Sequence, residues 1–190
     1  MKAIVVKPGQ KDSIHMRDMQ DPKLKPDLVA VKMLRVGLCG TDGEINQGLY
    51  GKPPDGDEFL ILGHENFGVV EQVGKKVKGF KAGDLVVSTV RRPCGHCYTC
   101  AQGENDMCLS GDYQERGIMR RHGFMAEYYV ESPEFGVITR QLVPSLTMWQ
   151  SEWVFLRVQY QWSRVANATA DHQLALQAVW AIGPHKHETY

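Results

Sequence analysis

The sequence predicts a mainly β fold, a barrel or a sandwich, over most of its length. Short runs rich in valine and aromatic residues recur, and several alternate apolar with polar side chains, as in Val29–Lys32. Glycine and proline mark turns between these runs, as in Lys7–Gly9 and Pro53–Gly56. Many short strands separated by such turns are typical of antiparallel barrels and sandwiches.

Five strands follow from this pattern in the first part of the chain. Each is a Val-rich or aromatic-rich run, and turn signals such as Ala82–Asp84 separate them. The predicted strands are Lys2–Val6, Leu28–Val36, Phe67–Val73, Asp84–Val90 and Phe124–Glu131.

The composition changes abruptly near residue 139, which predicts two parts of different design. Eighteen of the 19 glycines precede this point, whereas all four tryptophans follow it. Lys186 is the only lysine beyond it. We therefore expect a β domain over residues 1–138 and an atypical tail over residues 139–190.

Two amphipathic helices are expected in the tail, at Trp149–Val165 and His172–Ile182. Val154, Val158 and Trp162 recur near helical spacing, and burial of one helix face is sufficient to account for them. No chemistry attaches to these residues.

Overall composition excludes several classes of function. The chain of 190 residues carries 22 basic and 22 acidic residues, so no net charge attracts nucleic acid or an anionic membrane. No apolar stretch approaches the roughly 20 residues that span a bilayer. The sequence begins Met-Lys-Ala and shows no signal peptide, so a cytoplasmic, reducing environment is expected.

Four cysteines form the most specific motif in the chain, with two residues between the first three and seven before the last. Short spacers of this kind let a chain fold around a tetrahedral zinc ion, which takes four thiolates in closed structural sites. An iron–sulfur cluster usually closes with a shorter spacer and a proline, and a disulfide framework suits shorter secreted chains, so both are weaker alternatives. The motif comprises Cys94, Cys97, Cys100 and Cys108.

A second group of candidate metal ligands lies upstream, at the ends of two predicted strands. Cys39 and His64 are candidate ligands of a zinc ion that keeps an open position, and Glu65 is a ligand or a neighbour that adjusts the metal's charge. Thr41 places a hydroxyl two residues from Cys39. Taken singly, each residue also has a structural role to which it would be suited, as a small buried hydrophobe, a core histidine or part of a turn.

The ordered combination of these motifs resembles the zinc-containing medium-chain alcohol and polyol dehydrogenases. Within that superfamily, three segments resemble the zinc-dependent glucose (aldose) 1-dehydrogenases, over about residues 1–138. The motifs are Cys39–Asp42, Gly63–Glu65, Val69–Gly74, Gly83–Val86 and the four cysteines, and the sugar-dehydrogenase segments are Val90–Cys94, Glu115–Ile118 and His122–Glu127.

The resemblance implies a GroES-like, partly open barrel with a structural zinc lobe, and it implies roles for single residues. Cys39 and His64 would hold a catalytic zinc with Glu65 beside it, while the four cysteines would hold the structural zinc. Thr41 would take part in proton transfer from the substrate hydroxyl, and Glu115 would bind ring hydroxyls of a sugar. An exposed loop carboxylate is the structural alternative for Glu115.

The activity implied is oxidation of the C1 hydroxyl of an aldose to the lactone. Zinc favours loss of the hydroxyl proton, and NAD or NADP accepts the hydride. The substrate would be a small sugar or alcohol, with no nucleic-acid or membrane partner, and members of this family are homo-oligomers.

The sequence departs from the family after Ser145. The Gly-x-Gly-x-x-Gly turn of a dinucleotide-binding domain is not found in these 190 residues, and the tail holds one glycine, Gly183. The isolated chain is therefore expected to be inactive, and a frameshift or truncation after about codon 140 is one hypothesis for the tail. Glu152 lies near the expected position of a further zinc ligand, but its surroundings do not match.

Two rival functions remain open at this point. One is a zinc-binding interaction module without catalysis. The other is a dehydrogenase for a simple alcohol or a threonine-like amino alcohol. The segment Glu115–Ile118 favours a sugar substrate over these.

Overall fold

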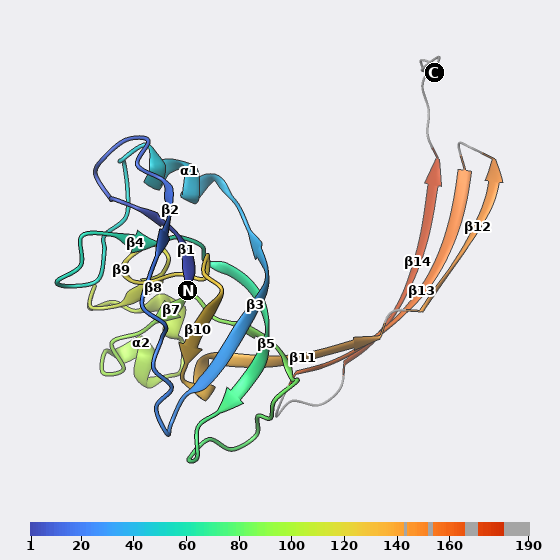
Figure 1. Cartoon of the computed structure of the whole chain (residues 1–190). Coiled ribbons are helices and arrows are strands. Elements are labelled where there is room, and N and C mark those ends of the chain that lie inside the picture. Colours follow the sequence, from blue (N-terminus) through green and yellow to red (C-terminus); the bar gives the residue numbers. More distant parts are fainter. Residues whose placement is uncertain (143, 152–153, 166–170, 181–190) are drawn as a thin grey trace. The chain divides into compact units, whose positions relative to one another are not determined.

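The computed structural model describes residues 1–190 except 143, 152–153, 166–170 and 181–190 (Figure 1). The chain divides into two compact units, Met1–Ile138 and Thr139–Tyr190. Glu152, the residue near the expected position of a further zinc ligand, is not among the described residues. Among the described helices, none has the length and apolar composition needed to span a membrane.

The first unit consists of short strands with two short helices and two 3-10 turns. The elements are β1 Lys2–Val6, β2 His15–Asp18, β3 Val29–Gly37, α1 Gly40–Asn46, β4 Leu60–Ile61, β5 Glu65–Val73, β6 Leu85–Ser88, β7 Arg91–Arg92, α2 Tyr98–Ala101, η1 Asn105–Met107, β8 Gln114–Arg116, β9 Arg120–Arg121, β10 Tyr128–Glu131, η2 Pro133–Phe135 and β11 Gly136–Leu142.

All five predicted strands are confirmed, and β1 has the predicted bounds. The strand expected from Phe124 begins four residues later, at Tyr128. The strands that the sequence did not predict in this unit are mostly two to four residues long, such as β4 and β7. Runs this short carry too little alternation to be recognised.

Three sheets form the first unit. β1 lies between β2 and β4, and β8 lies between β7 and β9. The largest sheet in this unit has the antiparallel order β10-β3-β5-β6-β11, in which Gly136–Ile138 is the part of β11 that pairs with β6. Figure 1 shows β3 and β5 running side by side as the longest pair of this sheet.

The core packs where β1, β4 and α1 meet. Val6, Leu60 and Ile45 are fully buried, and Leu62 and Ile118 join the same cluster. Burying a side chain of this size contributes about 1.5–3 kcal/mol. This cluster anchors α1, the helix that follows Cys39.

A buried carboxylate organises a second part of the core. Glu131 is 1% exposed, and its Oε2 accepts hydrogen bonds from Arg92 and from Arg116 at 2.7 Å. Its Oε1 accepts the backbone N–H of Ser132 at 2.9 Å and lies 3.5 Å from the guanidinium of Arg121. One carboxylate thus serves three arginines from β7, β8 and β9.

The described part of the tail is an antiparallel sheet formed by the end of β11 and by β12, β13 and β14, so the prediction of two helices there was wrong. β12 is Ser145–Ser151, β13 is Val154–Val165 and β14 is Asp171–Trp180. One edge of β13 pairs with β12 and with Thr139–Leu142 of β11, and β14 pairs with the other edge.

The physical reason for this error is a period-two pattern that the helical spacing obscured. Leu156, Val158 and Tyr160 alternate along β13, and Val158 and Tyr160 are the cross-strand neighbours of Leu176 and Leu174 in β14. β-branched and aromatic side chains on one face favour strand pairing over a helix.

We expect Glu131→Gln to lower the free energy of unfolding by about 3–5 kcal/mol at pH 7, because it leaves buried guanidiniums without their carboxylate. Burial raises the pKa of Glu131, but Arg116, Arg92 and Arg121 outweigh it and hold that pKa below the ordinary 4.5. The stabilisation is therefore present above pH 4.5 and lost as the pH falls through the folded-state pKa.

Urea unfolding of both proteins between pH 7 and pH 3 measures this difference. The gap between the wild type and Glu131→Gln should shrink as the medium becomes acidic. A gap that stays constant over this range would contradict the assignment.

Candidate metal centres

The pairing of β3 with β5 brings the first group of candidate ligands together. Gly37, the last residue of β3, lies opposite Glu65, the first residue of β5. Cys39 follows two residues after Gly37, and His64 immediately precedes Glu65. Residues 25 positions apart in the sequence therefore meet at one end of this strand pair.

The structure places Cys39, His64 and Glu65 in one cluster, as the sequence suggested. One potential ligand atom from each lies within 4.8 Å of the others. Cys39 Sγ is 3.1 Å from His64 Nε2, close to the separation of about 3.5 Å that zinc bond lengths give for a sulfur and a nitrogen on one tetrahedral ion. The donor set of thiol, imidazole and carboxylate suits zinc.

Asp42 is a further residue of this group, which sequence analysis treated only as part of a turn or cap. Its Oδ2 accepts the backbone N–H of Cys39 at 3.1 Å and so caps the N-terminus of α1. Its Oδ1 lies 3.7 Å from His64 Nδ1, and both atoms are buried without a hydrogen-bond partner. A carboxylate behind the ring favours the tautomer with the proton on Nδ1 and leaves Nε2 to face Cys39.

Gly37 provides the space for the Glu65 side chain. A Cβ at Gly37 would lie 2.0 Å from Glu65 Oε2 and 2.9 Å from its Cβ. No larger residue fits opposite Glu65 without displacing its carboxylate from the cluster. The sequence signal is a glycine at the end of a strand, and a glycine in that position also occurs at bulges and tight bends.

Three glycines pack closely together at the residue that precedes His64. A Cβ at Gly117 or Gly123 would lie 2.2 or 2.3 Å from the carbonyl oxygen of Gly63. Gly63 itself has φ of +91°, and its carbonyl accepts the N–H of Phe124 at 2.9 Å. Three backbone segments cross here at a distance that only glycine permits.

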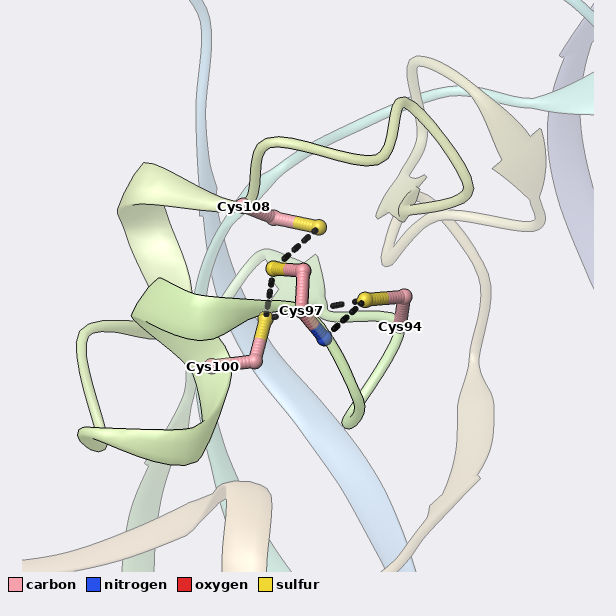
Figure 2. Close-up of side chains that lie close together, drawn as sticks. All are labelled: Cys94, Cys97, Cys100 and Cys108. Carbon is pink, nitrogen blue, oxygen red and sulfur yellow. Dashed lines mark hydrogen bonds between the residues drawn. The ribbon is translucent and has the colours of Figure 1, made fainter.

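The four remaining cysteines converge on a separate point of the first unit (Figure 2). Cys97 Sγ lies 3.3 Å from Cys100 Sγ and 4.0 Å from Cys108 Sγ, and Cys94 Sγ lies 3.8 Å from Cys100 Sγ. Zinc–sulfur bonds of about 2.3 Å place sulfurs about 3.8 Å apart at tetrahedral angles. All five cysteines of the chain are free thiols, so no disulfide accounts for this arrangement.

The thiols of the four-cysteine group differ in pKa. The Thr99 hydroxyl and the backbone N–H groups of Cys100 and Leu109 lower the pKa of Cys97 to about 5. Partial burial and the neighbouring Cys97 raise the pKa of Cys100 to about 12. Four thiolates this close repel one another, and a bound cation is what would let all of them ionise.

Comparison with known proteins agrees with this arrangement. Residues 25–140 match the alcohol dehydrogenase GroES-like domain. The chain belongs to that family. It is 54% identical to the glucose 1-dehydrogenase of Methanocella arvoryzae over 135 residues, which are 70% of this chain and 38% of that protein. Glucose 1-dehydrogenase 1 of Caldivirga maquilingensis is 44% identical over 144 residues, 75% of this chain and 40% of that one.

Solved structures give the same result. The glucose dehydrogenase of Haloferax mediterranei, in complex with NADP, Zn and gluconolactone, superposes with a TM-score of 0.66 at 37% identity, covering 74% of this chain and 39% of that one. Galactitol-1-phosphate dehydrogenase from Escherichia coli gives a TM-score of 0.60 at 30% identity, with 72% and 37% covered. The chain thus spans about two fifths of the length of the relatives it matches.

Two other residues of the GroES-like domain, Thr41 and Glu115, were predicted to act on the substrate rather than to hold the metal. Thr41 is the second residue of α1 and is half-buried. Glu115 lies in β8, where its Oε1 accepts bonds from Arg91 Nε at 3.1 Å and Arg91 Nη2 at 2.6 Å. With a side chain only 12% exposed, Glu115 is not an exposed loop carboxylate, and its charge helps burial to raise the pKa of Tyr50.

An apolar cavity of about 440 Å³ adjoins the Cys39 group within this domain. Cys39 and Asp42 line it together with aliphatic side chains, among them Leu38 and Leu62. Asp42 is 5% exposed, so these walls shield its carboxylate from water. A shielded carboxylate interacts more strongly with the imidazole in front of it.

We expect Gly123→Ala to lower the free energy of unfolding by about 1–3 kcal/mol, because its Cβ would lie 2.3 Å from the carbonyl oxygens of Leu62 and Gly63. Backbone atoms cannot move aside as a flexible side chain can. Chemical denaturation measured by circular dichroism gives the difference.

Gly43→Ala is the matched control, because nothing lies within 4 Å of a Cβ there and the residue is in α1. Its stability should stay the same or rise by up to about 1 kcal/mol. If Gly43→Ala lowered the free energy of unfolding as much as Gly123→Ala does, close backbone packing at Gly63 would not be the cause.

Proposed function

We propose that this chain is the catalytic-domain part of a zinc-dependent, NAD(P)-linked sugar dehydrogenase of the glucose 1-dehydrogenase type. The observation that carries the proposal is the cluster of Cys39, His64 and Glu65, whose ligand atoms lie within 4.8 Å of one another. The relatives named glucose 1-dehydrogenase, at 54% and 44% identity, supply the substrate class.

The Cys39 group would hold a zinc ion that leaves room for substrate. Three protein ligands and an open position distinguish a catalytic zinc from a closed structural one. Such an ion lowers the pKa of a hydroxyl that binds it, and so helps an alcohol to lose its proton near neutral pH. Asp42 would fix the His64 ring, so that Nε2 rather than Nδ1 faces the cluster.

The four-cysteine group would hold a second zinc with no open position. It uses all four tetrahedral sites for protein sulfur and therefore has no place for a substrate oxygen. Its role would be to fold the segment that contains α2 and η1, because neither helix has a buried residue of its own to hold it in place.

Thr41 and Glu115 would handle the substrate itself. The Thr41 hydroxyl can both accept and donate a proton, which suits transfer from a substrate hydroxyl. Arg91 holds the Glu115 carboxylate in a fixed orientation through two donors on one oxygen. A carboxylate held in this way can accept hydrogen bonds from sugar hydroxyls without losing rotamer freedom on binding.

The reaction would remove the proton of the C1 hydroxyl and a hydride from C1 of an aldose and yield the lactone, with a nicotinamide cofactor as the hydride acceptor. The Haloferax mediterranei enzyme, described with NADP, Zn and gluconolactone, supports this direction of chemistry.

Metal content tests the two proposed zinc sites. The purified chain should bind two zinc ions, of which Cys39→Ala removes one and Cys97→Ala removes the other, as measured by atomic emission after dialysis. A single zinc that is insensitive to Cys39→Ala would instead support a zinc-binding module without catalysis.

Asp42→Asn refines this experiment, since an amide still caps α1 but cannot offer a negative charge to His64. We expect the affinity of the Cys39 site for zinc to fall about 10- to 100-fold, while the four-cysteine site is unchanged. Equal effects on both sites would indicate a general loss of structure.

A chimeric enzyme tests the activity. Residues 1–138 of this chain should replace the matching segment of the Methanocella arvoryzae glucose 1-dehydrogenase, to which the chain is 54% identical over 135 residues. The chimera should oxidise glucose with NAD⁺ or NADP⁺, and His64→Ala should reduce kcat/KM by about 10³-fold or more, comparable to the loss of a major electrostatic contribution.

Simple alcohols and threonine serve as alternative substrates in the same assay. A chimera that oxidises them but not glucose would reject the sugar specificity and keep the zinc dehydrogenase. A chimera that binds two zinc ions and oxidises none of the substrates would overturn the proposed function.

A further inference from the structure

A second cavity, of about 520 Å³, lies in the first unit and is separate from the one that contains Cys39. The two cavities share no lining residue, although Ile61 lines one and the next residue, Leu62, lines the other. Pockets of this volume hold small organic molecules. The proposed dehydrogenase reaction makes no use of this cavity.

Positive charge dominates the wall of this cavity. Arg116, Arg120 and Arg121 line it, and no carboxylate side chain does so in the described part of the chain. Behind the wall, Glu131 is the single carboxylate shared by Arg92, Arg116 and Arg121. Burial, with a smaller contribution from the guanidiniums of Arg121 and Arg92, outweighs Glu131 and lowers the pKa of Arg116 to about 10.

Two further acidic residues approach the wall without removing this excess. Asp21 Oδ1 lies 2.6 Å from the N-terminal ammonium of Met1, which lines the cavity, and these two charges cancel. Asp57 Oδ2 lies 3.1 Å from His122 Nε2, and His122 lines the cavity. Burial lowers the pKa of His122 despite Asp57, so the ring is largely neutral at pH 7. Four guanidiniums against two carboxylates leave an excess of two positive charges.

Arg121 has donors to spare for a ligand. Its guanidinium lies 3.5 Å from both Gln114 Oε1 and Glu131 Oε1, distances at the limit of hydrogen bonding, and its Nε is buried without a partner. Arg116, by contrast, makes bonds of 2.5–3.0 Å to Glu131 and to two backbone carbonyls. An under-satisfied guanidinium at a cavity wall is suited to a bidentate contact with an anion.

Arg120 is held at the same wall by an unusual backbone conformation. Its φ is +55°, a left-handed value that a non-glycine residue adopts at a cost, and Asp12 is the other such residue in the described part of the chain. Its guanidinium bonds only to the carbonyls of Gly111 and Tyr113 among its described hydrogen bonds. Strained residues of this kind concentrate at functional sites.

The remaining walls are apolar, formed in part by Met1, Met19, Pro54 and Ile61. We propose that this cavity binds a small organic anion, with a carboxylate or phosphate group on Arg120 and Arg121 and an apolar body against these side chains. The ligand would compensate the excess charge of the arginine cluster, which the protein's own carboxylates leave in place.

Benzoate and phenyl phosphate are suitable probes, with benzyl alcohol as the neutral counterpart of the same shape. Calorimetric titration of the 190-residue chain should give a Kd below about 1 mM for at least one anion and at least tenfold weaker binding of benzyl alcohol. The anion that binds more tightly distinguishes carboxylate from phosphate recognition.

Arg121→Gln and Arg120→Asn should each weaken anion binding by about tenfold or more, as expected for the loss of a hydrogen bond to a charged group. Asparagine tolerates the left-handed conformation of residue 120. Arg35→Gln is the matched control, because Arg35 is an exposed arginine of β3 outside the cavity lining. Its effect should be less than twofold.

Two further measurements keep the result specific. Cys39→Ala should retain anion binding, which separates this cavity from anion binding at a metal in the Cys39 group, and thermal unfolding checks that each variant is folded. A Kd above about 1 mM for both anions, equal binding of benzyl alcohol, equal loss in Arg35→Gln, or loss in Cys39→Ala would each overturn the proposal.

Discussion

The register between β3 and β5 is the constraint on which the candidate site depends. It places Gly37 opposite Glu65, and the chain then delivers Cys39 and His64 from the two strands to one point. Because side chains alternate between faces, a slip of one residue would turn Glu65 to the other side of the sheet. A side chain at Gly37 would have a similar effect, since its Cβ would overlap the Glu65 carboxylate.

The parts of the site that follow from the sequence are those whose members lie close together in the chain. The four cysteines span 15 positions and converge as their spacing predicts, because short loops leave few other arrangements. Cys39 and His64 were grouped as candidate ligands from the residues alone, and the resemblance to dehydrogenases strengthened the grouping, because the strand pairing that joins them is long-range. The contact of Glu115 with Arg91 was not predicted, because it depends on the pairing of β7 with β8.

What the sequence did not predict depends on backbone geometry or on packing. From the sequence, Asp42 resembles an ordinary helix cap. Only the structure shows that its other oxygen, Oδ1, faces His64 Nδ1. The arginines around Glu131 come from three short strands that no pattern indicates. In the tail, helical and alternating patterns overlap in the same residues, and pairing with neighbouring strands decided between them.

Two carboxylates of this domain, Glu131 and Glu65, differ in how their charge is balanced, and the difference is consistent with the proposed metal site at Glu65. Glu131 is neutralised by arginines, so its oxygens have no capacity left for a metal ion. No ion pair joins Glu65 to a lysine or an arginine among the described residues. On the proposed function, a cation from solution would balance the charge of Glu65 and of the thiolates, and thiolate and imidazole ligands favour zinc over harder ions.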